Sequence, residues 1–406
     1  MSNTMKRKNI LIVFFILFPL YTLPWIVQGM MRLEKWAFVL WAFFMGLVGI
    51  LYPPVGDIYQ YTKDFYIYEG CSWEFFLELL SLKFDFLLPL LSYFIGLIGW
   101  NFDISRFIYN FLSYLILGTI FLDIVRNNVF LRTNKQVVTY ALGTFLVFSF
   151  ITYLWRFGFS TVLFAYGSYL LVYKSKNKGW VFVALSILNH VSFLLFAIGL
   201  FVQQMGGFRF YKWIVVLLCL CSMFLNSSIF TSILPYMPTD IVQRFGSYVD
   251  GYYATDYFAD GSWKYQLQIF LTSSITYVAV VIYLLIYRGN NKIEAITNAI
   301  LVLACLSLPF DTMRMRFLAV LLFFIKMFFL TQYDGTLKNL RCIKVMFLCV
   351  MIGNVLSVWG ARRQIEISDY ELLLYSTIPQ IMSHTYSLQW IDKNVTSDGD
   401  IVKINY

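Results

Sequence analysis

The sequence predicts an all-α polytopic membrane protein, and three observations support this fold class. Of the 406 residues, 60% are hydrophobic and only 13% are charged, whereas soluble domains carry about 25% charged residues. The mean hydropathy is +0.69. Apolar runs of roughly 15 to 24 residues recur along the whole chain, and most can cross a hydrocarbon core of about 30 Å as helices. We expect about 11 to 13 transmembrane helices, one or two of them broken or re-entrant, in a single integral-membrane domain, 1–406.

The candidate spans follow one another with short connections. To within a few residues they are 10–28, 36–52, 84–100, 106–125, 137–155, 157–173, 179–202, 211–233, 265–287, 295–309, 314–332 and 343–360. Residues 53–83 and 234–264 are predicted to be loops outside the cytoplasm, and 361–406 a C-terminal tail. The basic residues 6–8 precede an apolar run without a small-residue cleavage site, so we expect a retained anchor rather than a removed signal peptide.

Basic clusters between the spans predict which loops face the cytoplasm. They are Arg126, Arg132 and Lys135; Lys174, Lys176 and Lys178; Arg288 and Lys292; and Lys338, Arg341 and Lys344. Loop 234–264 then lies outside only if span 179–202 is broken near Asn189–His190 into half-helices that enter and leave on the same side. The same alternation puts the basic N-terminus and the acidic loop 53–83 on one side of the membrane, although their charges predict opposite sides. Two explanations are open: residues 73–100 are a folded-back pair of helices, or the first spans are miscounted.

Arg156 stands between two apolar runs that no polar loop separates. The chain is therefore predicted to reverse around residues 155–158, at the outer membrane face. An arginine at membrane depth costs about 2.5–3.5 kcal/mol and usually pairs with an anion or lines a wet cavity. Arg156 either contacts an anionic ligand at this face or extends to water as a surface anchor.

Four more arginines are predicted on the same outer side, namely Arg106, Arg244, Arg314 and Arg316. Guanidinium groups bind phosphate oxygens in a bidentate manner, so several converging arginines suit a pyrophosphate. Arg314 and Arg316 are two positions apart on one helix and point about 200° apart, so at most one of them faces a given cavity.

Both outer loops combine aromatic rings with carboxylates, which is the composition that a carbohydrate cleft needs. Sugar faces stack on aromatic rings, and sugar hydroxyls bond to carboxylates and amides. The alternative is the aromatic belt of an ordinary membrane protein. The glycan-binding candidates are Tyr59, Tyr61, Arg244, Tyr252, Tyr253 and Trp263.

His190 is one of two histidines in the chain. Either it is a hydrogen-bonded packing residue, or it takes the proton of an attacking sugar hydroxyl near the suspected helix break. Known catalytic signatures such as a Walker loop, HExxH, CxxC and GxSxG are absent, and no paired acidic motif follows the first span. We therefore predict no metal and no cofactor.

The order of these features resembles that of a known family. Asp57 is followed by the tyrosine-rich run Ile58–Tyr61, then come Arg156, the basic loop 174–178, His190-Val191-Ser192, and Arg314 or Arg316. This order is similar to that of the bacterial repeat-unit polymerases of surface polysaccharide, the Wzy type, and in particular of the EpsG-like branch. In that family a polar residue often follows the arginine. Here Phe157 follows Arg156, so the sequence does not show what orients the guanidinium.

The resemblance implies a glycosyltransferase of the bacterial inner membrane that polymerises O-antigen of lipopolysaccharide, or a related polysaccharide, on the periplasmic side. A growing glycan on undecaprenyl pyrophosphate would be the donor and a lipid-linked repeat unit the acceptor. Membrane lipids and a chain-length regulator would be partners, and nucleic acid would not. Arg156 with Arg314 or Arg316 would stabilise the departing pyrophosphate, and His190 or Asp57 would be the base.

Two other functions remain open. A transporter or flippase of lipid-linked repeat units would bind the same groups, but it predicts matching interrupted spans in two halves, and no internal duplication is evident. A membrane acyltransferase would need a histidine near an early span, and none precedes His190.

Overall fold

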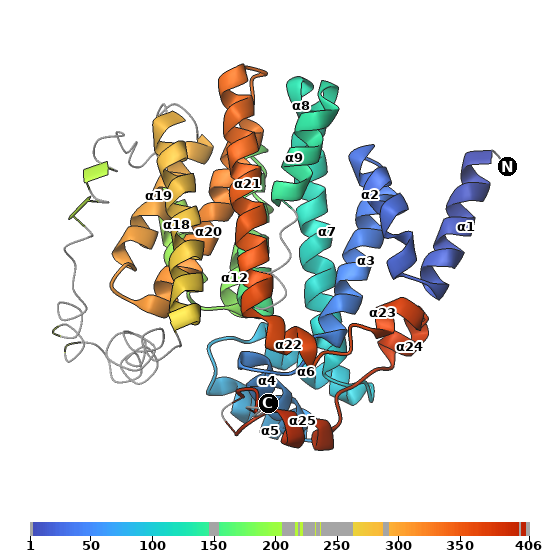
Figure 1. Ribbon diagram of the computed structural model, residues 1–406. Helices are drawn as coiled ribbons and strands as arrows, with labels where there is room; N and C mark the ends of the chain where they lie inside the picture. The colour runs from blue at the N-terminus through green and yellow to red at the C-terminus, as the bar shows by residue number, and fades with distance from the viewer. Residues whose placement is uncertain are drawn as a thin grey trace.

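The computed structural model describes residues 3–145, 154–204, 263–286, 292–397 and 399–402, with a few single positions between 216 and 236. Helices run side by side in a bundle, and shorter helices gather at one end of it (Figure 1). Within these residues only an isolated bridge between Val395 and Ile401 is extended pairing. The predicted all-α fold class is confirmed.

The helices occur in an order that follows the predicted spans. They are α1 (Asn3–Leu17), η1 (Leu20–Thr22), α2 (Leu23–Met31), α3 (Lys35–Leu51), α4 (Asp57–Tyr68), α5 (Trp73–Ser81), α6 (Leu87–Leu97), α7 (Asp103–Asn127), α8 (Val129–Thr133), α9 (Lys135–Phe145), α11 (Trp155–Ser168), the π-helical η2 (Tyr169–Tyr173), α12 (Gly179–Asn189), α13 (Phe193–Gln204), α18 (Trp263–Ile286), α19 (Lys292–Leu306), α20 (Asp311–Thr331), α21 (Leu337–Gly360), α22 (Arg362–Glu366), α23 (Leu372–Tyr375), α24 (Ile378–Met382) and α25 (Leu388–Asn394).

In the part of the chain that the structure describes, α7 and α21 are long and apolar enough to cross a membrane. Shorter apolar helices include α3, α6, α12 and α13. The candidate span 211–233 lies almost wholly outside the described residues. The count of 11 to 13 spans stays a prediction, since several candidates form helices shorter than a membrane is thick.

The first candidate span, 10–28, is not one helix. It is broken after Leu17, and Pro19 follows, which has no backbone N–H to continue the helical ladder. Helices α1 and α2 therefore run side by side (Figure 1). The N-terminus and α4 consequently lie towards opposite ends of the bundle, so the conflict in the predicted topology came from counting the first span as a single crossing.

The predicted loop 53–83 is also helical, because it forms α4 and α5. Gly56 precedes α4 with a φ of +58°, a conformation that favours glycine, and so allows the sharp entry into this helix. Ser72 caps α5 by accepting a hydrogen bond from the Phe75 N–H at 3.3 Å. The aromatic and acidic side chains of this region are therefore held on helical faces rather than on an irregular loop.

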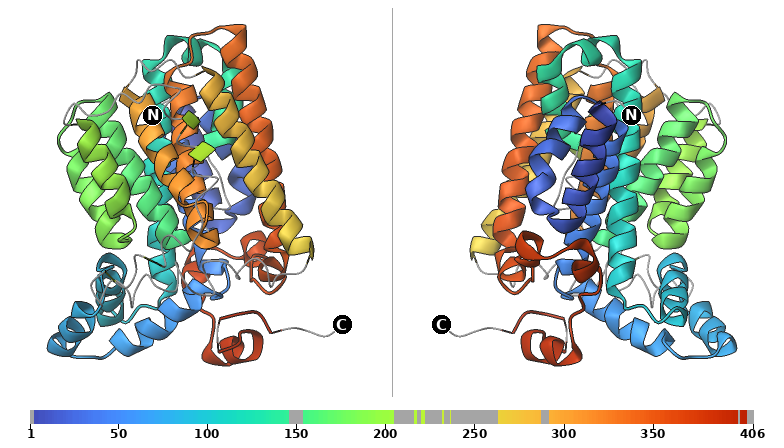
Figure 2. Two further views of the ribbon diagram at one scale, coloured as in Figure 1. Left: turned by 90° about the vertical axis from the view of Figure 1, so that its left-hand side faces the viewer. Right: turned by 90° about the vertical axis from the view of Figure 1, so that its right-hand side faces the viewer.

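A chain reversal at Arg156 and a helix break at His190 were predicted, and the structure bears on both. Residues 155–158 form the first turn of α11, so the predicted chain reversal does not lie there. The break in span 179–202 is present as predicted, because α12 ends at Asn189 and α13 begins at Phe193. The turn between them lies at the end of the bundle that carries α4 and α6, which we call the α4 end (Figure 2).

Three of the four predicted basic clusters lie at the opposite end, which we call the α8 end, and Arg288 of the fourth lies outside the described residues. Arg126, Arg132 and Lys135 lie in or beside α8, and the cluster from Lys338 to Lys344 opens α21 there (Figure 1). Lys174 joins them through an ion pair of 2.7 Å with Asp123 near the end of α7. The two ends of the bundle therefore differ in charge.

Helices α11 and α12 approach each other closely through a pair of glycines. A Cβ atom on Gly167 would lie 2.7 Å from the carbonyl oxygen of Gly179 and 2.8 Å from a methyl group of Val183. Small residues allow this kind of close helix contact in membrane proteins. The contact fixes the spacing between the helix that begins beside Arg156 and the helix that ends beside His190.

We expect Gly167→Ala to destabilise the protein by about 1–3 kcal/mol, because the new methyl group must push α12 away. The matched control is Gly353→Ala in α21, where the added Cβ would meet no atom within 4 Å. Thermal unfolding of the detergent-purified protein measures both. A Gly167→Ala midpoint equal to that of the control would show that the helices are not held by this contact.

Candidate functional site

A small cavity at the α4 end, of which a water-sized sphere can enter about 10 Å³, is lined by residues from four distant parts of the chain. Helix α4, the first turn of α11, the α12–α13 turn and the beginning of α20 contribute to it. Its lining residues are Asp57, Tyr61, Leu154, Trp155, Arg156, Phe157, His190 and Arg316. We call it the arginine cavity. It brings together four of the predicted catalytic and pyrophosphate-binding residues, and one predicted glycan-binding residue.

Arg156 is held by a carboxylate and an aromatic ring. Its Nη1 lies 3.0 Å from Asp85 Oδ2, and its guanidinium lies 4.7 Å from the centre of the Tyr61 ring. The other carboxylate oxygen of Asp85 accepts a hydrogen bond of 2.8 Å from the Val191 N–H. Asp85 therefore orients the guanidinium and ties it to the α12–α13 turn.

Asp85 is a site residue that the sequence patterns did not reveal. Its signal is weak but present, since a carboxylate directly precedes the apolar run of α6. A charge at the edge of a span usually has a partner. That partner comes from a segment about 70 residues away, which no local pattern shows.

Arg316 enters the arginine cavity from α20. Its Nη2 lies 3.6 Å from Asp57 Oδ2, and its guanidinium lies 5.8 Å from the centre of the Phe157 ring. The Asp57 side chain is 62% exposed, so water screens this pair and an incoming anion can compete for the guanidinium. Arg314 is directed elsewhere and donates to Asp311 Oδ1 at 2.7 Å and to the Leu308 carbonyl at 3.4 Å.

His190 lies outside both helices, in the turn between α12 and α13. Its Nδ1 is 2.8 Å from Ser192 Oγ, and its ring packs edge-on against Phe157 at 5.1 Å. Burial, and then the positive charges of Arg156 and Arg316, hold the pKa of His190 well below its usual value. The imidazole is therefore neutral near pH 7 and able to accept a proton.

The buried side-chain amide of Asn189 holds the backbone of Arg156 in place against the end of α12. Asn189 Nδ2 donates to the Arg156 carbonyl at 2.8 Å and to Ser160 Oγ at 2.7 Å. Its Oδ1 accepts a hydrogen bond of 2.5 Å from the Tyr109 hydroxyl. Helices α7, α11 and α12 are thus joined at one fully buried side chain.

Trp155, which lines the arginine cavity, has a side-chain N–H group without a hydrogen-bond acceptor in the described residues. This N–H group, at Nε1, is buried. Burying an unpaired N–H costs about 1–3 kcal/mol. An oxygen of a bound ligand could satisfy it.

Among the residues that the structure describes, none of the other predicted binding residues lines this cavity. Arg106 is only 1% exposed and donates to the carbonyls of Ile50 and Tyr52 and to Asp103, so it joins α3 to α7. The Tyr59 ring is buried beneath Lys63 Nζ at 4.2 Å. Trp263 is exposed at the beginning of α18. The remaining candidates, Arg244, Tyr252 and Tyr253, lie outside the described residues.

Within the described ranges, no group of three or more histidine, cysteine or acidic residues is placed to hold a metal ion. The polar side chains of the arginine cavity are instead two guanidiniums, an imidazole, a phenol, an indole and one carboxylate. Such a set is suited to an anion with several oxygens.

Apolar helices in a bundle, with this arginine-lined cavity at one end, define an all-α membrane protein. The EpsG family profile matches residues 34–376, most of the chain, and the protein belongs to the EpsG family. It is thus a polymerase-like membrane protein of polysaccharide synthesis, and the resemblance seen in the sequence is confirmed. Searches of curated proteins and of solved structures each find no match.

We expect Asn189→Ala to lower the free energy of unfolding by about 1–3 kcal/mol, since it leaves the Tyr109 hydroxyl and the Arg156 carbonyl without their partner. Asn127→Ala is the control, because Asn127 is exposed at the other end of α7 and should change stability by no more than about 0.5 kcal/mol. Thermal or denaturant unfolding compares the two. Equal effects would mean that the buried amide does not join the helices.

The lowered pKa of His190 predicts how stability depends on pH. As the pH falls below about 6.5, the unfolded chain binds a proton at this position before the folded protein does. Stability should therefore decrease below that pH, by up to about 1.4 kcal/mol per pH unit from this group. His190→Gln should remove this contribution, whereas His384→Gln should leave it. Unfolding midpoints between pH 7 and 5 measure the difference, and parallel curves for wild type and His190→Gln would contradict the prediction.

Proposed function

We propose that this protein polymerises undecaprenyl-pyrophosphate-linked repeat units on the periplasmic side of the inner membrane. The growing lipid-linked glycan is the donor and a single lipid-linked unit is the acceptor. The observation that carries the proposal is that Arg156, Arg316 and His190, from three distant segments, line one cavity. Family membership supports the reaction class.

The reaction requires a stabilised leaving group. The acceptor hydroxyl oxygen attacks the anomeric carbon of the donor, the bond from that carbon to the pyrophosphate oxygen breaks, and lipid pyrophosphate departs. Arg156 is already oriented by Asp85, and Arg316 pairs with the exposed carboxylate of Asp57. Preorganised guanidiniums stabilise the charge that develops on the leaving oxygen without reorganising during the reaction.

The acceptor hydroxyl must also lose its proton. In the proposed mechanism His190 takes it, because the buried imidazole is neutral and lies in the same cavity as both arginines. Asp57 is the second candidate, but its carboxylate is exposed and paired with Arg316. Bond formation at the sugar, departure of pyrophosphate and transfer of the proton then balance without a nucleotide or a redox partner.

The size of the arginine cavity limits what it can hold. A water-sized sphere can enter only about 10 Å³ of it, roughly the space of one water molecule and far below the roughly 300–1,000 Å³ of ordinary ligand pockets. It can therefore receive a phosphate oxygen but not a whole sugar. The rest of the donor and acceptor glycans must therefore lie on neighbouring surfaces of the α4 end.

Charge supports the proposed orientation in the membrane. Basic clusters gather at the α8 end, which the positive-inside rule places in the cytoplasm. The arginine cavity at the α4 end then faces the periplasm, where lipid-linked repeat units are joined. Membrane lipids and a regulator of chain length are the partners that this reaction requires.

We expect Arg156→Ala and His190→Ala to reduce long-chain polysaccharide to single repeat units when each replaces the wild-type gene. The control is Arg341→Ala, which removes an exposed arginine at the α8 end and should leave chain length unchanged. Gel profiles of surface polysaccharide measure chain length, and immunoblots of membranes confirm equal protein levels. Normal chains in both cavity variants would end the proposal. Loss of exported single units as well would favour the flippase.

A further inference from the structure

A larger cavity lies on the other side of α4. A water-sized sphere can enter about 230 Å³ of it, which is somewhat below the roughly 300–1,000 Å³ of ordinary ligand pockets. We call it the tail cavity, because Thr385, Tyr386 and Ile391 of the C-terminal tail form part of its wall. The other lining residues are Pro54, Thr62, Phe65, Tyr66, Glu69, Gly99, Trp100, Asn101, Phe102 and Asp103.

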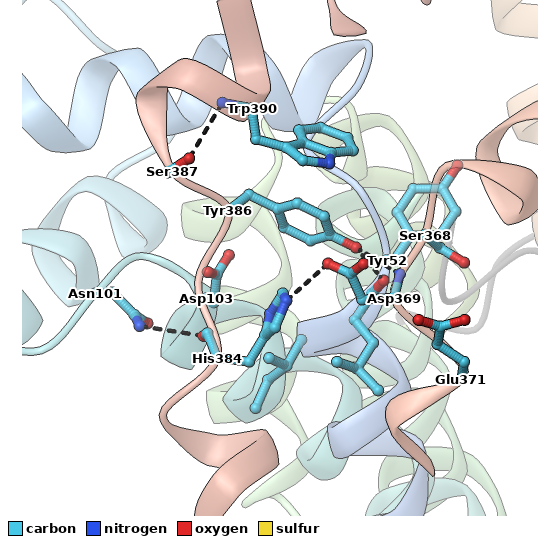
Figure 3. Close-up of polar contacts among 12 residues, drawn as sticks. Tyr52, Asn101, Asp103, Ser368, Asp369, Glu371, His384, Tyr386, Ser387 and Trp390 are labelled. Carbon is cyan, nitrogen blue, oxygen red and sulfur yellow. Dashed lines mark hydrogen bonds and ion pairs between the residues drawn. The ribbon is translucent and has the colours of Figure 1, made fainter. Parts of the chain in front are cut away.

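The tail is fixed in place by hydrogen bonds rather than by loose contact. The Tyr386 hydroxyl donates to the Leu51 carbonyl at 2.6 Å and accepts from the Asp369 N–H at 3.1 Å. His384 Nε2 lies 2.8 Å from Asp369 Oδ2, and the His384 carbonyl accepts from Asn101 at 3.3 Å (Figure 3). These hydrogen bonds make the wall of the tail cavity an ordered part of the fold. The part of the tail beyond residue 376 lies outside the family match.

A second contact holds the end of the tail against the beginning of α4. The Gly56 N–H donates to the Gly399 carbonyl at 2.8 Å. A Cβ atom on Gly399 would lie 3.0 Å from the Gly56 oxygen, and the φ of Gly399 is +91°. Only glycine meets both conditions without strain.

The lining of the tail cavity combines aromatic rings with uncharged and acidic polar groups. Trp100 is 54% exposed and Tyr66 is also exposed, whereas Phe65 and Phe102 are buried. Asn101 Oδ1 is buried and has no hydrogen-bond partner in the described ranges. Asp103 is neutralised by its ion pair with Arg106, so Glu69 is the carboxylate left for a ligand.

This composition selects a class of ligand. No lysine or arginine is among the described residues that line the tail cavity, so a phosphate or an acidic sugar would lack a counter-charge there. Aromatic rings offer flat apolar faces, while Asn101 and Glu69 accept hydrogen bonds from hydroxyl groups. An uncharged sugar presents both kinds of surface.

The two cavities share a wall. Asp57 and Tyr61 on α4 line the arginine cavity, and Thr62 and Tyr66, on the adjoining face of the same helix, line the tail cavity. Behind α4, Phe102 of the tail cavity packs edge-on against Trp155 of the arginine cavity, at 5.9 Å between ring centres. A glycan can therefore contact both cavities by passing over one helix.

We propose that the tail cavity is a binding subsite for uncharged sugar residues, separate from the pyrophosphate site. The identity of that glycan as a repeat unit rests on the proposed function. Holding sugars next to the arginine cavity supplies the proximity that a reaction between two glycans requires. Figure 3 shows the tail segment that forms part of the wall of this subsite.

The test separates binding of sugar from binding of phosphate. The probe is the repeat-unit oligosaccharide cut from the organism's own surface polysaccharide, without lipid or phosphate, titrated calorimetrically into the full-length protein in detergent. Trp100→Ala and Glu69→Gln should each weaken its binding on the order of tenfold. Trp100→Phe, which keeps a ring, should recover most of the affinity. Trp25→Ala removes a comparably exposed tryptophan (51%) from α2 and should bind as wild type.

Inorganic pyrophosphate is the second probe, and it should show the reverse pattern. Arg156→Ala should lose pyrophosphate binding and keep oligosaccharide binding, while Trp100→Ala should do the opposite. Wild-type affinity for the oligosaccharide in both Trp100→Ala and Glu69→Gln, or no binding by the wild-type protein, would overturn the subsite. Long polysaccharide chains from both Arg156→Ala and His190→Ala cells would instead end the proposed function and leave the subsite in place.

Discussion

The arrangement of this protein depends on how one fully buried amide, Asn189, is satisfied. It ends α12, binds the backbone of Arg156 at the beginning of α11, and accepts a hydrogen bond from Tyr109 on α7. A buried polar group without partners is costly, so these three helices cannot move apart independently. The break in the α12–α13 segment is stabilised by this network, and it places His190 and Arg156 in the same cavity.

The two arginines of the arginine cavity are paired with carboxylates to different degrees, and the difference suggests different roles in binding a ligand. Asp85 holds Arg156 at 3.0 Å, whereas Asp57 lies 3.6 Å from Arg316 and is mostly exposed. Arg156 is therefore held in position, whereas an anion can compete with the exposed Asp57 carboxylate for Arg316. In the proposed mechanism a departing pyrophosphate takes over the place of the Asp57 carboxylate beside Arg316, and Arg156 does not need to move.

The C-terminal tail extends the surface of the α4 end beyond this cavity. Its docking on Leu51, Asn101 and Gly56 encloses a second cavity whose lining differs in kind. Cations line the first cavity, and aromatic, amide and carboxylate groups line the second. A lipid-linked glycan has the same two parts, a charged diphosphate and an uncharged chain of sugars. The division of chemistry along α4 thus matches the division within the proposed substrate.

The sequence by itself determined the all-α membrane class, the break at Asn189–His190, and the order of Asp57, Arg156 and His190 that marks the family. These follow from hydrophobicity and local pattern, which act over short stretches of chain. Only the tertiary structure decided that Asp85 orients Arg156, that Arg316 rather than Arg314 lines the cavity, and that Arg106 is occupied by backbone carbonyls. The partner of a charged side chain comes from segments tens to hundreds of residues away, and helix packing alone brings them together.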